Sequence, residues 1–221
     1  MKKKENIIIR LILKLKKIIL LIKSKLSIKN IINFFIIFFV ILLYIFVFLS
    51  IYTNFRERKR KEITSKVIKK VDDIIKENKD NVNEATINYN DNKYTVLGKL
   101  KIDKINIYEP ILKENTKYSL DVSVVKIYGP SLNKKGNVVL GGHNFMKGNY
   151  FIKIMKLEKN DKITVIDLSG NSLDYYVFDY YKTTINDANY FRQPNNNEKI
   201  LTLVTCTKGG SQRYVVKAKA N

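Results

Sequence analysis

The sequence predicts a mostly β fold, an eight-stranded barrel with short helices, preceded by an N-terminal transmembrane helix. A long uncharged apolar run lies near the N-terminus. From about Tyr94 onward, short runs rich in Val, Ile, Tyr and Thr alternate with Asn, Gly, Lys and Asp, which is the pattern of strands and turns. About eight such strands in roughly 125 residues favour a closed barrel, because an open sheet would leave its edge strands exposed.

The apolar run reads FFIIFFVILLYIFVFLSIY over residues 34–52 and carries no charge in 19 residues. Extended to 31–53, it is long enough to cross the roughly 30 Å of hydrocarbon in a bilayer. A cleavable signal peptide would have a shorter apolar region with small residues at its cleavage site, and this run contains neither Ala nor Gly. We therefore expect an uncleaved signal anchor.

Basic residues are concentrated around this anchor. The net charge is +21, but residues 1–61 hold 15 Lys and Arg against two acidic residues, whereas residues 62–221 hold 26 against 18. Beyond the anchor the two signs are interleaved, which is typical of a solvated surface and argues against nucleic-acid binding.

The orientation of the anchor follows from the wider charge distribution. Both flanks are basic, so the positive-inside rule is ambiguous close to the helix. The first 30 residues contain ten Lys and Arg against Glu5, which favours a cytoplasmic N-terminus and an extracellular remainder. Arg10, Lys14 and Lys17, at helical spacing, predict a basic amphipathic helix on an anionic leaflet, the alternative being a plain positive flank. The expected location is therefore the cell membrane, with a single pass.

Four parts are expected along the chain. Apolar residues at near-helical spacing over 57–79 predict a stalk helix, and the Asn- and Asp-rich stretch 80–95 predicts a linker. The parts are a basic cytoplasmic or interfacial segment at 1–30, the transmembrane anchor at 31–53, the helical stalk and linker at 54–93, and the barrel at 94–221.

Within the barrel, β-type runs and two helical stretches are expected. The helices are predicted at 119–127 and 150–157. The strands are predicted at 95–102, 105–107, 137–140, 162–167, 173–182, 200–206 and 213–218.

The chain contains one cysteine and one histidine, and each comes at the end of an apolar strand-like run. Cys206 ends KILTLVTC, and His143 follows NVVLGG. A single Cys forms no intramolecular disulfide, and one Cys with one His cannot build a thiolate–imidazole zinc site. Strand ends hold side chains rigidly at the solvent boundary, which suits a nucleophile and its proton partner. Arg213 follows Cys206 by seven residues across a turn with two glycines, so a hairpin would return it beside the thiol.

These three residue types together predict nucleophilic catalysis. A nearby cation favours the reactive thiolate of a cysteine, a histidine passes protons between leaving and incoming amines, and an arginine holds a developing oxyanion. Taken singly, each has an ordinary alternative: an inert core cysteine, a loop histidine, and one arginine of a basic surface. Only the joint arrangement indicates an active site.

That arrangement resembles the sortase family, the cysteine transpeptidases of Gram-positive cell surfaces. The matching segments are GGHN at 141–144, TLVTC at 202–206, Arg213 in RYVVKAKA, and LGKLKIDKINIYEPIL at 97–112. The resemblance covers residues 94–221 and implies an eight-stranded barrel that cleaves an LPxTG-like sorting signal on a secreted protein.

The resemblance also implies roles for the residues. Cys206 would form a thioacyl intermediate, and an amine of a lipid II-like peptidoglycan precursor would resolve it. His143 would act as general acid and then base, and Arg213 would position the substrate and stabilise the oxyanion. Thr205, beside the nucleophile, is expected to contact substrate or contribute to the oxyanion site.

Departures from the family pattern bear on the subtype. Gly141 stands where the family often has Ala. An Asp-Pro-aromatic lid motif before the barrel and a second apolar span after it are not visible, which argues against a pilin-polymerising type. Some members use calcium, and Glu158, Asp187 and Glu198 are possible ligands, but acids in loops are usually solvated, so we expect no metal and no cofactor.

Three other functions remain open from the sequence. A membrane-anchored cysteine peptidase that only hydrolyses would share Cys206 and His143. A non-enzymatic barrel that binds a cell-surface partner would contain an ordinary thiol. A basic membrane-surface protein acting through residues 1–61 would leave the barrel without a role.

Overall fold

The computed structural model describes residues 12–17, 28–77, 82–89, 92–144, 150–195, 197–207 and 209–220. Contacts divide the chain into two compact units, Met1–Thr53 and Asn54–Asn221. In the first unit, residues 12–17 are helical and exposed, and helix α2 (Ile28–Lys76) begins. Arg10, which belongs to the predicted amphipathic helix, lies outside the described residues.

Helix α2 is the described helix that is long and apolar enough to cross a membrane. Its N-terminal half contains the predicted anchor, and its Ile, Leu and Phe side chains are exposed throughout that half. A helix satisfies its own backbone hydrogen bonds, which is what a segment surrounded by lipid requires. Length, composition and exposure therefore agree with a membrane span.

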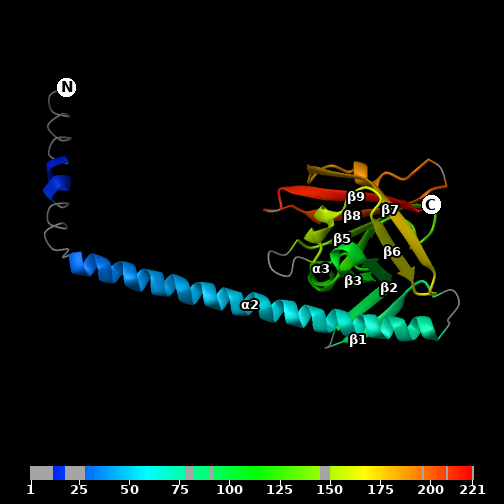
Figure 1. Cartoon of the computed structure of the whole chain (residues 1–221), viewed down its shortest axis with the longest axis horizontal. Helices are drawn as coiled ribbons and strands as arrows, with labels where there is room; N and C mark the ends of the chain where they lie inside the picture. The colour runs from blue at the N-terminus through cyan, green and yellow to red at the C-terminus, as the bar shows by residue number, and fades with distance from the viewer. Residues whose placement is uncertain are drawn as a thin grey trace, which may run out of the picture. The chain divides into compact units, whose positions relative to one another are not determined.

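The second unit contains a closed barrel of eight strands, as predicted. Its strands are hydrogen-bonded in the order β2-β3-β4-β5-β8-β9-β7-β6, and β6 pairs back onto β2 (Figure 1). Closure leaves no edge strand in this ring. The bounds are β2 Asn92–Ile102, β3 Ile107–Leu112, β4 Val124–Tyr128, β5 Gly136–Gly142, β6 Lys162–Asp167, β7 Ser172–Thr184, β8 Lys199–Cys206 and β9 Gln212–Ala220.

Short helices connect the strands. The helix α3 spans Lys117–Val122, and the 3₁₀ helices are η1 Asp103–Ile105, η2 Ile152–Lys156 and η3 Asn189–Phe191. Thr116 caps α3, because its side chain accepts a hydrogen bond from the backbone of Ser119 at 3.1 Å. The predicted helix at 150–157 is therefore found as a 3₁₀ helix.

Three predicted elements differ from the structure. The strand expected at 105–107 is not found there, because residues 103–105 form η1, Asn106 has a left-handed φ of 50°, and β3 begins at Ile107. The stretch 119–127 was expected to be one helix, but α3 ends at Val122 and β4 begins at Val124. Ser123 between them is extended and fully buried, and its hydroxyl donates to the carbonyl of Pro110 at 2.7 Å, which ties this break to β3. The expected linker contains a strand, β1 (Ala85–Tyr89), which pairs with β2 outside the barrel ring.

The stalk is packed on the barrel rather than held away from it. Ile63, Val67 and Val71 of α2 are buried at four-residue spacing, so they form one face of the helix. That face packs in a cluster with residues of β1 to β4, including Ile87 and Leu112. Complete burial of such a side chain contributes roughly 1.5–3 kcal/mol, so the C-terminal half of α2 is part of the barrel unit.

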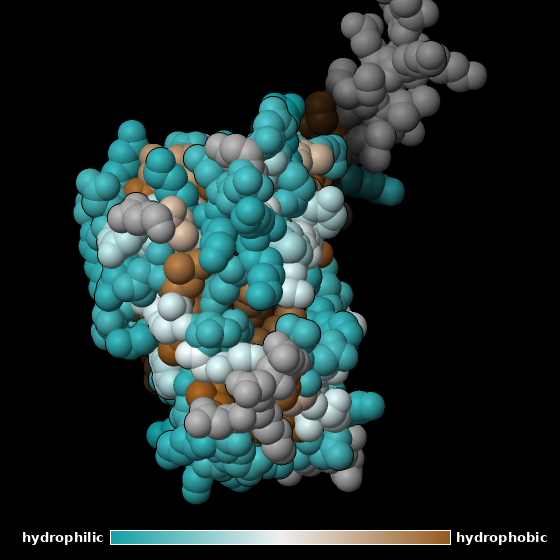
Figure 2. Space-filling model, turned by 90° about the vertical axis from the view of Figure 1, so that its right-hand side faces the viewer, coloured by the Kyte–Doolittle hydropathy of each residue, from teal (hydrophilic) through white to brown (hydrophobic). Residues whose placement is uncertain are grey.

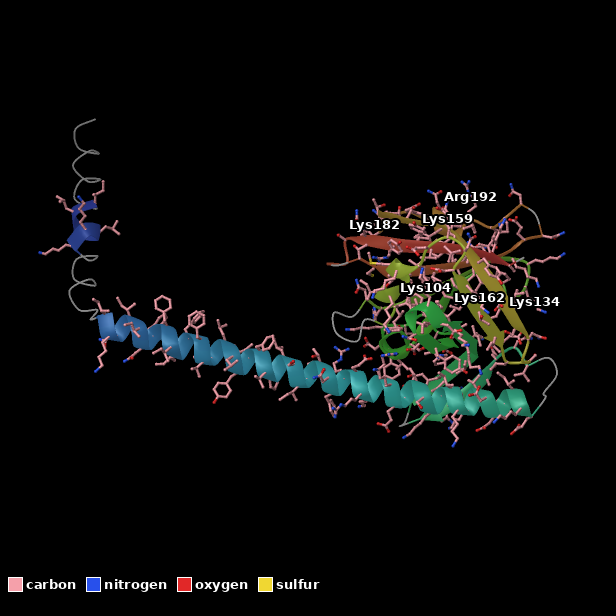
Figure 3. The ribbon with its side chains drawn as sticks, in the orientation of Figure 1. Lys104, Lys134, Lys159, Lys162, Lys182 and Arg192 are labelled. Carbon is pink, nitrogen blue, oxygen red and sulfur yellow. The ribbon has the colours of Figure 1, made fainter. Side chains whose placement is uncertain are left out.

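The surface of the barrel unit is charged and mixed in sign. The face in Figure 2 is mostly hydrophilic, with small and separated hydrophobic areas. Figure 3 labels six basic side chains that come from separate strands and loops. Two of them have acidic partners: Lys104 contacts Glu158 at 2.6 Å, and Lys162 contacts Asp174 at 3.3 Å. Positive charge on the barrel is thus interleaved with negative charge.

Candidate active site

The strands β5 and β8 are neighbours, run parallel and end together. Their register pairs Gly142 with Thr205. His143 directly follows the end of β5, and Cys206 is the last residue of β8. Because the carboxyl ends of parallel strands meet at the same edge of a sheet, the structure brings the single histidine and the single cysteine of the chain to one edge of the barrel.

Arg213 lies directly across from Cys206. The β8–β9 hairpin pairs the two residues in its register, and its turn contains Gly209 and Gly210 at φ values of 84° and 75°. These left-handed conformations favour glycine. Cys206 is half-buried, and the Arg213 guanidinium donates to the backbone carbonyls of Gly210 and Gln212, each at 3.4 Å. The hairpin therefore places Arg213 opposite Cys206 on the neighbouring strand.

His143 is half-buried between two polar neighbours. Its ring Nε2 lies 3.8 Å from Asp121 Oδ1, and its backbone N–H donates to the Tyr150 hydroxyl at 3.3 Å. Burial lowers the pKa of His143, and although the Asp121 carboxylate opposes this, Arg56 and Lys117 reinforce it. The imidazole is therefore mainly neutral at neutral pH, which is the form that accepts a proton.

Two further residues join the strand ends. Asn144 donates from Nδ2 to the carbonyl of Cys206 at 2.7 Å, so it fixes the backbone that carries the thiol. Thr205 donates from Oγ1 to the carbonyl of Gly142 at 2.9 Å and is 2% exposed. This bond gives the Thr205 side chain a structural role, and its contact with substrate stays a prediction. Asn144 was not singled out from the sequence, although it stands in the GGHN motif.

Tyr190 packs beside the ends of β8 and β9 that carry Cys206 and Arg213. It is buried in a small cluster with Val204 and Val215, the residues of β8 and β9 that lie two positions from Cys206 and Arg213. Burial raises the pKa of Tyr190, while Arg213 lowers it and Cys206 raises it. The tyrosine is therefore close enough to both groups to feel their charges. No feature of the sequence distinguished it from the other 13 tyrosines.

The acidic residues named above as possible calcium ligands have other partners. Glu158 accepts from Lys104 at 2.6 Å, and Asp187 accepts from Thr183 at 2.5 Å. Within the described part of the chain, no group of three or more His, Cys, Asp or Glu side chains is placed to hold a metal ion.

Comparison with protein-family models gives one assignment for this barrel. The model that describes the sortase domain matches residues 100–221, a segment that contains all but the first strands and the whole site. The chain belongs to the sortase family.

Individual sortases show the same relationship. Sortase A of Bacillus anthracis is 32% identical over 127 residues, which cover 56% of this chain and 59% of that protein. The chain thus matches less than two thirds of the length of this curated relative. Sortase C-1 of Actinomyces oris is 26% identical with a TM-score of 0.53, over 57% of this chain and 74% of that one. The sortase D5 transpeptidase of Clostridium perfringens is 29% identical with a TM-score of 0.52, over 57% and 79% of the two chains. These scores do not separate subtypes, so the exclusion of a pilin-polymerising type stays a prediction.

Gly141 and Gly142, the two glycines before His143, have different neighbours. A Cβ on Gly142 would lie 2.6–2.9 Å from three atoms of the fully buried Phe151, including its own Cβ. A Cβ on Gly141 would clash with the terminal methyl group of Ile127 and lie 3.1 Å from its Cγ1, but the end of this flexible side chain can change its rotamer. An alanine at position 141 therefore requires a change in the Ile127 rotamer, whereas an alanine at position 142 would have to displace the buried Phe151.

Gly142→Ala is expected to destabilise the barrel by about 1–3 kcal/mol, the usual cost of overpacking, and to displace the strand end that carries His143. A small displacement of a reacting group is costly, so peptide cleavage should fall by at least about tenfold. Gly141→Ala is the matched control and should have a smaller effect on stability and on peptide cleavage. Unfolding curves and kcat/KM for the two variants measure this, and an equal or larger loss in Gly141→Ala would contradict it.

Proposed function

We propose that this chain is a cysteine transpeptidase that cleaves an LPxTG-like sorting signal and transfers the cleaved protein to a cell-wall amine. One observation carries the proposal. The parallel pairing of β5 with β8 puts His143 and Cys206 at one edge, and the β8–β9 register puts Arg213 across from Cys206. Membership of the sortase family supports it independently.

In the first half of the reaction, His143 takes the proton of the Cys206 thiol, and the resulting thiolate attacks the carbonyl carbon of the scissile peptide bond. The negative charge that develops on the carbonyl oxygen is stabilised by the Arg213 guanidinium. The carbon–nitrogen bond then breaks, and the leaving amine takes a proton from His143, so a thioester to Cys206 remains. Because burial lowers the pKa of His143, protonated His143 is the stronger acid and gives up its proton readily.

In the second half, an amine of a lipid II-like precursor attacks the thioester. His143, now neutral, accepts the proton of that amine, and the collapse of the intermediate forms a new amide and releases the Cys206 thiol. Water in place of the amine would give a free acid. The proposal therefore differs from a hydrolysing peptidase only in the group that resolves the thioester.

The cellular setting is part of the same proposal. Helix α2 anchors the enzyme in the membrane with its N-terminus in the cytoplasm, and the barrel acts outside on secreted proteins of a Gram-positive-type surface. The substrates are secreted proteins with a C-terminal sorting signal, the acceptor is the peptidoglycan precursor, and no metal takes part. The type of the enzyme is not the pilin-polymerising one.

The test uses the full-length protein in detergent micelles or lipid nanodiscs, because the helix of the stalk packs on the barrel. It is incubated with a quenched LPxTG-type peptide library, with and without oligoglycine, and products are identified by mass spectrometry. The chain has one cysteine, so alkylation with iodoacetamide is a selective block. A ligated product that alkylation removes supports the transpeptidase. Free acid alone supports a hydrolysing peptidase, and no thiol-dependent cleavage by a folded sample supports a surface-binding barrel.

A further inference from the structure

Two arginines of helix α2 contact residues that in turn contact His143. Arg56 and Arg60 stand four residues apart, so they lie on the same face of the helix. Both belong to the compact unit that contains the barrel. Neither was predicted to belong to the site, and each leads to His143 through one intermediate residue.

The first connection runs through Asp121 at the end of α3. Its Oδ1 lies 3.8 Å from Arg56 Nη2 and 3.8 Å from His143 Nε2. Both distances are those of ion pairs rather than hydrogen bonds. The Asp121 side chain is 34% exposed, and that of Arg56 is 50% exposed, so a pair of this kind contributes little to stability. The pair matters because it holds the Asp121 carboxylate beside the ring of His143.

The second connection runs through Tyr150. Its hydroxyl accepts the backbone N–H of His143 at 3.3 Å and donates to the carbonyl of Ser123 at 2.9 Å. Its ring lies under the Arg60 guanidinium, 4.4 Å from the centroid. Arg60 is itself fixed by Glu109 at 2.9 Å. Unlike the exposed first connection, this one is buried, since Tyr150 is 3% and Arg60 7% exposed.

We propose that helix α2 positions the imidazole of His143, with Arg56 acting on its ring through Asp121 and Arg60 acting on its backbone through Tyr150. The inference rests on the proposed function, since it takes His143 as the group that moves the proton. Asp121, Arg56, Arg60 and Tyr150 are positioning residues and do not touch the reacting atoms. The stalk thereby belongs to the catalytic apparatus as well as to the anchor.

The charges around His143 give this inference a measurable signature. Asp121 and Lys117 of α3 and Arg56 of α2 face its ring, Tyr150 binds its backbone, and Cys206 with Arg213 lie on the neighbouring strands. Among these, Asp121 raises the pKa of His143, whereas Arg56 and Lys117 lower it. Asp121→Asn should therefore lower the pKa of His143, and Arg56→Gln should raise it. A general loosening of the fold would not shift the pKa in opposite directions.

The experiment titrates His143 by NMR in the full-length protein, labelled with ¹³C-histidine and held in detergent micelles. The chain contains one histidine, so its imidazole gives one signal. The same samples are assayed for cleavage of the best peptide of the library described above. Asp121→Asn should reduce kcat about tenfold and Arg56→Gln about threefold, the size expected when a proton-transfer group is misplaced but present. KM should change little, and Arg56→Lys should restore most of the loss.

Matched variants make the test specific. Arg58→Gln removes the same charge from an exposed position of the same helix and should change neither the pKa of His143 nor kcat. The double variant Arg56→Gln/Asp121→Asn should lose no more kcat than Asp121→Asn alone. Tyr150→Phe, which removes the acceptor of the His143 N–H, should lower kcat with KM retained.

Unchanged titration and kcat in Asp121→Asn would overturn the inference, as would equal effects of Arg56→Gln and Arg58→Gln. Failure of the proposed function would give a different result, because the wild-type protein itself would then cleave no peptide. In that case the opposite pKa shifts still test the connection from α2 to His143, independently of any reaction.

Discussion

Replacement of Cys206 by alanine is expected to reduce transpeptidation by about 10³-fold or more, because it removes the only atom in the chain that can form the thioester. The chain has no second cysteine to take over. The half-buried thiol contributes little to packing, so the barrel should unfold at nearly the same denaturant concentration. Rates of peptide ligation and unfolding curves of the full-length protein measure the two expectations.

Cys206→Ser is the informative companion of this variant. It keeps the size of the side chain but has a hydroxyl in place of the thiol, which His143 and Arg213 do not activate to the same degree. Its rate should also fall steeply, with binding of the peptide retained. If either variant kept a tenth of the wild-type rate, the nucleophile would have to lie elsewhere in the chain.

Arg60→Met is expected to lower the free energy of unfolding of the barrel unit by about 3 kcal/mol, because it leaves Glu109 buried without its cation. Glu109 is 8% exposed and accepts from Arg60 at 2.9 Å. In contrast, Glu109→Gln should cost less, since Arg60 keeps Glu57 as a partner at 3.3 Å. Denaturant unfolding in micelles measures both, and the double variant should recover part of the loss of Arg60→Met.

The pH dependence of the Arg60→Met variant follows from the sign of the shift at Glu109. Burial raises the pKa of Glu109 above its ordinary value, and Arg60 opposes that rise. Without Arg60 the folded-state pKa rises further, so the folded protein binds the proton more tightly than the unfolded chain does. Stability from this group is then present at low pH and is lost as the pH rises through the folded-state pKa. The deficit of Arg60→Met should therefore be smaller at pH 5 than at pH 8, and an equal deficit at both would contradict this account.

The barrel could be predicted because each strand shows the residue pattern of a strand within its own short segment. Apolar β-type runs bounded by turn residues, such as 200–206 and 213–218, predict the strands. Closure into a barrel is predicted because an open sheet would leave its edge strands exposed. The hairpin spacing between Cys206 and Arg213 placed these residues near each other, and their pairing in the β8–β9 register is observed. The catalytic roles of His143, Cys206 and Arg213 stay predictions.

The differences arise where distant contacts decide the structure. Nothing local breaks the stretch 119–127, and the break at Ser123 depends on its bond to the carbonyl of Pro110 in another strand. The stretch 80–95 is predicted as a linker because it is rich in Asn and Asp, but Ile87 of β1 packs against α2 and the barrel. Local pattern therefore predicts an element only where tertiary packing does not overrule it.

The same reasoning explains which residues near the site were missed. Asp121 is one of 20 acidic residues, and Arg56 one of 41 basic ones. Their types carry no information about the site, and their positions in the chain are 22 and 87 residues from His143. Only the packing of α2 and α3 beside the end of β5 brings them together, so no pattern in the sequence identifies them.

The parallel pairing of β5 with β8 also determines when the site forms during folding. The hydroxyl of Thr205 reaches the carbonyl of Gly142 across 63 residues of sequence, and the chain between them contains β6 and β7. Contacts of such separation form late, because a long loop must be closed before any of them is made. A chain whose strands have not yet closed into the ring therefore keeps Cys206 apart from His143. The approach of these two residues is a property of the finished barrel, and a partly folded chain does not have it.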